Sequence, residues 1–166
     1  MNEKKLQSKN QEKRVAKETK GKTTPASGAF WSAKADVRSK LFLVECKTTQ
    51  KDFYSLTEVV WSKIYREAMK DGMRIPIMCI DLNNGREVLA VLSTYDLGNF
   101  PPPSSYADAL LRNKGKPNLS ERLRYNEHGT RFILESKNLG IHDLSAIPWK
   151  YFLSDVIPYY EEVMLK

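Results

Sequence analysis

The strongest β signal in this chain is the segment AKADVRSKLFLVECKTT, residues 33–49. Two short runs of strand-forming residues, 33–37 and 41–49, are separated only by residues 38–40, and this spacing predicts a tight β-hairpin. Side chains alternate between the two faces of a strand. The second run is apolar on both faces at its start and charged on one face at its end, which indicates a functional site at the end of the strand.

Three residues with useful chemistry fall on one face of this hairpin. A short turn sets Asp36 near Leu43, one alternate position from Glu45, and diagonal neighbours on one face lie about 7–8 Å apart. Two carboxylates, a backbone carbonyl and waters form the incomplete oxygen shell that Mg²⁺ prefers when a phosphate supplies the other ligands. Lys47 follows on the same face and can orient or deprotonate a water, or stabilise charge on phosphorus. The pattern suits metal-assisted phosphodiester hydrolysis; an exposed cross-strand ion pair is the alternative interpretation.

The excess positive charge of the chain lies in its first quarter. The 166 residues include 27 Lys and Arg against 20 Asp and Glu, a net charge of +7. Residues 1–40 hold eleven basic and four acidic side chains, so the remainder is neutral. This asymmetry favours a polyanionic partner, either nucleic acid or an anionic membrane surface. No apolar run approaches the about 18 residues of a membrane span, so nucleic acid is the favoured partner.

The cysteines and the chain start indicate the expected compartment. Cys46 and Cys79 lie inside apolar runs, which predicts reduced, buried side chains, and two cysteines cannot form a zinc cluster. The basic residues near Met1 are not followed by a hydrophobic stretch, so no secretory signal is expected. We therefore expect a cytoplasmic protein.

The rest of the pattern is typical of an α/β protein with one domain over residues 1–166. We expect a disordered start over residues 1–10 and a flexible excursion over residues 96–130, which Pro, Gly and Ser interrupt. A capping-box spacing from Ser55 to Glu58 marks the start of the best helix. Helices are expected at residues 9–20, 55–69, 106–112 and 148–164, the last broken near Pro158. Further strands are expected at residues 75–82, 87–95 and 131–135.

Two segments resemble a known nuclease superfamily. The runs SGAFWSAKADV, residues 27–37, and LVECKTT, residues 43–49, are similar to those of PD-(D/E)xK nucleases, and within them to the Holliday-junction-resolvase-like group, which has phage members. That group usually has glycine where this chain has Ala35. The likeness covers roughly residues 11–95. Further residues follow in the order that the group shows, namely Trp61, Lys63-Ile64, Glu67-Ala68, Gly72 and Pro76.

The resemblance implies a restriction-endonuclease-like core, in which helices flank a central mixed β-sheet. It implies that Asp36 and Glu45 are metal ligands, joined by the backbone carbonyl of Cys46, and that Lys47 is the catalytic lysine. The expected cofactor is Mg²⁺, with Mn²⁺ as the other possible metal.

The resemblance also extends to the amino-terminal segment. Glu12 matches an acidic residue that this group sends from its first helix toward the metal site; an exposed carboxylate paired with Lys9 or Lys17 is the alternative. Ser27 matches a small polar residue near the phosphate. Contacts with the DNA backbone are expected from Lys13, Arg14, Lys17, Lys20, Lys22, Ser27 and Lys34.

These inferences together predict a metal-dependent DNA endonuclease that cuts branched DNA as a homodimer. The dimer interface is expected on the helix of residues 55–69 or on the aromatic carboxy-terminal helix. One alternative is another nuclease of the same superfamily, acting in recombination, restriction or end processing. The other is a non-catalytic nucleic-acid-binding protein with the same fold.

Overall fold

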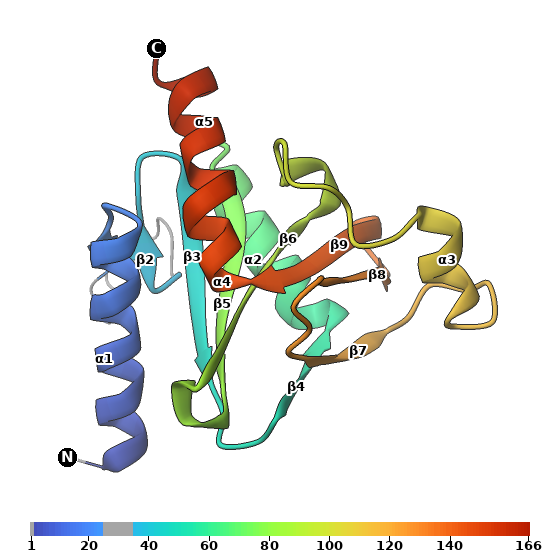
Figure 1. The fold of residues 1–166 in the computed structure, drawn as a ribbon, viewed down its shortest axis with the longest axis horizontal. Helices are drawn as coiled ribbons and strands as arrows, with labels where there is room; N and C mark the ends of the chain where they lie inside the picture. The colour runs from blue at the N-terminus through green and yellow to red at the C-terminus, as the bar shows by residue number, and fades with distance from the viewer. Residues whose placement is uncertain (1, 25–34) are drawn as a thin grey trace.

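A seven-stranded mixed sheet forms the centre of the protein, with helices on both faces (Figure 1). The structure is a computed structural model that describes residues 2–24 and 35–166. The strands in their order across the sheet are β1 (Lys22–Thr23), β2 (Val37–Arg38), β3 (Phe42–Thr48), β5 (Ile75–Leu82), β6 (Glu87–Ser93), β9 (Gly140–Pro148) and β8 (Thr130–Ser136). β3 and β5 are parallel, whereas the other neighbours are antiparallel. The α/β class and the helix-flanked mixed sheet are therefore as expected from the sequence.

Within residues 2–24 and 35–166, five α-helices and a second, two-stranded sheet complete the fold. The helices are α1 (Glu3–Glu18), α2 (Glu58–Lys70), α3 (Tyr106–Leu111), α4 (Trp149–Tyr151) and α5 (Ile157–Met164). Short turns of other helix types are η1 (Asn83–Gly85), η2 (Thr94–Asp96) and the π-helical η3 (Phe152–Val156). The small sheet pairs β4 (Phe53–Thr57) with β7 (Ser120–Arg124).

The predicted hairpin is present, but its register differs from the expected one. β2 and β3 pair antiparallel with Val37 opposite Val44. Continuing this register sets Asp36 level with Glu45, rather than opposite Leu43. The two carboxylates are therefore direct cross-strand neighbours, which is closer than the diagonal arrangement predicted from the sequence.

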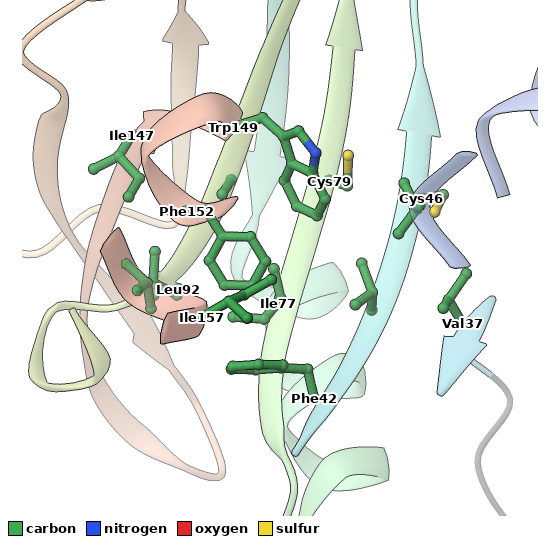
Figure 2. Packing of buried hydrophobic residues seen from close by; sticks show 14 of the residues in the cluster. Val37, Phe42, Cys46, Ile77, Cys79, Leu92, Ile147, Trp149, Phe152 and Ile157 are labelled. Atoms are coloured by element: carbon green, nitrogen blue, oxygen red, sulfur yellow. The ribbon is translucent and has the colours of Figure 1, made fainter. Parts of the chain in front are cut away.

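Apolar side chains cover both faces of the central sheet. On one face, Phe42 and Cys46 of β3 belong to one cluster with Trp149 and Phe152 from the carboxy-terminal helices (Figure 2). Val15 of α1 belongs to the same cluster. On the other face, side chains of β4 and α2 pack on β5, β6, β8 and β9. β3 is covered on this second face as well, since Leu43 packs in a small separate cluster with Ala35 and with Ala68 of α2. Both cysteines are free and buried, as expected.

The start of α2 differs from the sequence prediction. Ser55 does not cap this helix but lies in β4, which pairs with β7 and buries Leu56. The actual N-cap is Thr57, whose hydroxyl accepts a hydrogen bond from the N–H of Val60 at 3.3 Å. The helix ends at the predicted place, where Asp71 is the C-cap residue.

Both chain ends are helical. α1 starts at Glu3, because the side chain of Asn2 accepts a hydrogen bond from Lys4 N at 3.1 Å and caps the first turn. The expectation of a disordered stretch over residues 1–10 is therefore wrong. At the other end, the expected helix is broken ahead of Pro158 by the π-helical turn η3, since proline cannot donate the backbone hydrogen bond of a regular helix.

Four strands of the described residues, β1, β4, β7 and β9, were not predicted from the sequence. Residues 96–130 contain the expected helix α3, but also β7, in which Leu123 is buried. β9 lies between β6 and β8, and it buries His142.

Candidate active site

Asp36 and Glu45 meet at the edge of β3 where β2 is absent. β2 begins only at Val37, so the N–H of Cys46 has no backbone partner in β2. It donates instead to the side chain of Asp36, whose Oδ2 accepts the hydrogen bond at 2.8 Å. The N–H and C=O of one strand residue point to the same side, so the carbonyl of Cys46 also faces this edge. The backbone carbonyl of Asp36 accepts a hydrogen bond from Thr24 N at 2.9 Å, which anchors the segment from its other side.

The carboxylate of Asp36 lies in a region of negative potential. Burial raises its pKa, followed by repulsion from Glu45 and then from Glu12, while the N–H of Cys46 and the charge of Lys47 oppose the rise. The pKa reaches about 6, well above its ordinary value of 3.8. A cation bound between these oxygens would relieve the repulsion and restore the charged form of Asp36.

Lys47 stands on the same face and is held by Glu45. The distance from Lys47 Nζ to Glu45 Oε1 is 2.9 Å, and the side chain of Glu45 is only 11% exposed. Burial disfavours the charge on Lys47, but the hydrogen bond and the charge of Glu45 outweigh it and raise the pKa of this lysine. Lys47 is thus a cation, suited to stabilising negative charge and orienting a water rather than to removing a proton.

Glu12 reaches this group from α1, which packs on β3. It is half-buried, accepts a hydrogen bond from Ser8 Oγ at 3.3 Å, and helps to raise the pKa of Asp36. Within the described residues it forms no ion pair with Lys9 or Lys17, the alternative partners. The structure therefore brings Glu12 to the same side of the sheet edge as the hairpin carboxylates.

A buried polar network beside the site was not expected from the sequence. The amide of Gln11, 2% exposed, donates from Nε2 to the carbonyl of Lys47 at 2.9 Å and to Asp81 Oδ1 at 3.0 Å. Arg14 binds both oxygens of Asp81, at 2.8 and 2.9 Å, and this contact raises the pKa of Arg14. Asp81 could have been noticed as a charge near the end of a buried strand, whereas Gln11 gave no signal in the sequence.

The expected DNA contacts divide into exposed and internally paired cations. Arg14 is engaged by Asp81, and Lys20 forms an ion pair with Glu161 at 2.8 Å, so neither is a free phosphate ligand. Lys13, Lys17 and Lys22 are exposed on α1 and β1. Ser27 and Lys34 lie outside the described residues.

The donor set was compared with the needs of Mg²⁺. Among residues 2–24 and 35–166, no group of three or more His, Cys, Asp or Glu side chains is placed to hold a metal ion. Mg²⁺ is usually bound through one or two carboxylates, with waters and substrate phosphate completing an octahedron. Asp36, Glu45 and the carbonyl of Cys46 supply oxygen donors of this kind. Burial is the main cause of the raised pKa of Asp36, and the repulsion from Glu45 and Glu12 that adds to it is a contribution that a bound cation would relieve. The chemistry of the site fits the metal.

Comparison with models of known protein families gives no match, and comparison with curated protein sequences gives none either. The likeness to resolvase-like nucleases therefore rests on the motif residues. A search of the helices in the described part of the chain finds none long and apolar enough to cross a membrane.

Proposed function

We propose that this protein is a metal-dependent DNA endonuclease with a restriction-endonuclease-like core, and that it is a Holliday junction resolvase acting on branched DNA. One observation carries the proposal. Asp36, Glu45 and Lys47 converge at one edge of β3, where the N–H of Cys46 fixes Asp36 and the charge of Glu12 acts on it from α1.

The residues of the site have distinct tasks in this proposal. Asp36, Glu45 and the carbonyl of Cys46 would hold Mg²⁺ or Mn²⁺, with Glu12 as a further carboxylate nearby. The bound metal supplies Lewis acidity and lowers the pKa of a water. Lys47, kept charged by Glu45, stabilises negative charge that develops on the phosphate oxygens.

The exposed cations of α1 and β1 support a nucleic-acid substrate. Lys13, Lys17 and Lys22 would contact the phosphate backbone without reading sequence, so binding is expected to weaken steeply with salt. Cutting paired strands requires two sites, so we propose a two-fold homodimer. Val59 on α2 and Val163 on α5 are exposed apolar residues on the two helices considered for the interface.

The test uses labelled four-way junction, flap, duplex and single-stranded DNA with Mg²⁺. The wild type is compared with Asp36→Asn and with a control, Asp155→Asn, which removes an exposed carboxylate from η3. Symmetric nicking of junctions, lost in Asp36→Asn and kept in the control, supports the proposal. Cutting of all substrates alike indicates another nuclease of this kind. Binding without cutting, unchanged by Asp36→Asn, refutes the enzyme and leaves a DNA-binding protein.

A further inference from the structure

The small sheet of β4 and β7, here named the ribbon, presents a second basic surface. Leu56 and Leu123 point from it into the core and are buried. Alternation then places Phe53, Arg122 and Arg124 on its outer face, with Phe53 directly opposite Arg124. This surface lies outside the first quarter of the chain, where the sequence placed the DNA contacts.

Three cations surround a single aromatic ring on this outer face. The guanidinium carbons of Arg122 and Arg124 lie 4.3 and 5.3 Å from the ring centroid of Phe53, and Lys51 Nζ lies 5.3 Å from it. Contacts with the ring hold these cations in place but do not neutralise them. Asp52 forms an ion pair with Arg124 and offsets one of the three charges, so the group as a whole keeps a net positive charge.

The ribbon adjoins the candidate active site. Tyr54 of β4 is near enough to Lys47 that each affects the pKa of the other, so the inner face of the ribbon borders the site. The turn after β5 packs on the chain ahead of β4, since Asn83 N donates to the carbonyl of Lys51 at 2.9 Å. Figure 1 shows the ribbon to the right of the arrowhead of β3 and below β8.

We propose that the outer face of the ribbon binds the phosphate backbone of the DNA beside the scissile phosphate. This inference rests on the proposed function. Charge complementarity selects the occupant, because Arg122 and Arg124 offer forked donors that match phosphate oxygens and lie next to a site suited to a phosphodiester. Arginine contacts of this type position DNA without specifying its sequence.

The first test measures binding to a labelled four-way junction without metal across a salt series. Arg122→Ala/Arg124→Ala is compared with Lys137→Ala/Lys166→Ala, which removes two exposed cations elsewhere. We expect the slope of log affinity against log salt to fall by about 2 in the ribbon variant, with affinity about tenfold weaker or more. The control should remain within about twofold of the wild type. An affinity equal to that of the control overturns the inference, and thermal unfolding verifies that both variants fold.

For a second variant, the inference predicts tighter DNA binding. Asp52→Asn releases Arg124 from its ion pair and should tighten binding several-fold and steepen the salt slope by about 1. A purely structural cluster would give no gain, so unchanged or weaker binding in this variant also counts against the inference. If the wild type cuts junctions and both ribbon variants bind DNA as the wild type does, the inference about the ribbon is refuted and the proposed function stands. If the wild type neither binds nor cuts DNA, both the proposed function and the inference about the ribbon are refuted. Both are refuted as well if the ribbon binds only an acidic protein surface.

Discussion

Replacing Asp36 with asparagine should stabilise the fold while abolishing cleavage. Asparagine has the same shape and can still accept the N–H of Cys46, which Asp36 binds at 2.8 Å, but it carries no charge next to Glu45. The pKa of Asp36 is raised from 3.8 to about 6, which means that folding penalises its ionised form. Asp36→Asn removes that penalty.

The magnitude follows from this shift. A rise of about 2 pKa units corresponds to about 3 kcal/mol at 1.36 kcal/mol per unit. Asp36 is only half-buried, so solvent screening reduces the value to about 1–2 kcal/mol. For a chain of this length, that is an increase in Tm of about 3–6 °C at pH 7.5.

The sign of the pH dependence provides the sharper check. Because the folded pKa lies above the unfolded value, the wild type is most favoured with Asp36 protonated and loses stability as the pH rises from 3.8 through about 6. Thermal unfolding without metal should therefore show the gain in Asp36→Asn at pH 7.5 and little gain at pH 4. Asp155→Asn should show neither. A variant less stable than the wild type at pH 7.5, or a gain of equal size at both pH values, would refute the electrostatic account.

Three further changes test other parts of the site. Lys47→Ala should reduce the cleavage rate about 100-fold or more, with less effect on DNA affinity, because it removes the charge that stabilises the phosphate oxygens. Single-turnover kinetics and binding measure the two quantities, and an equal loss of rate and affinity would argue against this role. Gln11→Leu removes the hydrogen bonds that Gln11 donates to the carbonyl of Lys47 and to one oxygen of Asp81. The free energy of unfolding should therefore fall by about 1–3 kcal/mol, and the cleavage rate should fall as well. An unchanged midpoint of denaturant unfolding would contradict this prediction. Gly21→Ala places a Cβ 2.8 Å from the carbonyl oxygen of Arg38, and we expect a loss of about 1–3 kcal/mol in the same assay, whereas an unaltered midpoint would show that β1 can shift.

The hairpin, β5 and β6 could be predicted because their signals are local. Alternation and turn residues within a few positions set each of them. β4 was missed because its pairing partner, β7, lies far along the chain, and the spacing from Ser55 to Glu58 offered a competing helical interpretation. The pattern of apolar residues alone cannot decide between these two, whereas burial of Leu56 against the core does.

The candidate site likewise has a part that the local sequence predicts and a part that only the packing of distant elements creates. Asp36, Glu45 and Lys47 lie on one hairpin, so the sequence places them together to within the register of a turn. Gln11 and Asp81 come together only because α1 crosses the ends of β3 and β5, a packing that no local pattern encodes. Predicting the network would have required the helix position first.

Net charge is a coarse guide to where a polyanion would bind, because it counts cations that the fold pairs internally. Arg14 is bound by Asp81, and Lys20 is paired with Glu161, so part of the amino-terminal excess is not available to a phosphate. Conversely, the neutral remainder of the chain gathers Lys51, Arg122 and Arg124 around the ring of Phe53, where Asp52 offsets one of the three charges. What attracts a polyanion is the local field of exposed, unneutralised groups near the point of contact. If the proposed function is right, DNA should therefore be held from both sides of the carboxylate edge, by the exposed lysines of α1 and by the ribbon.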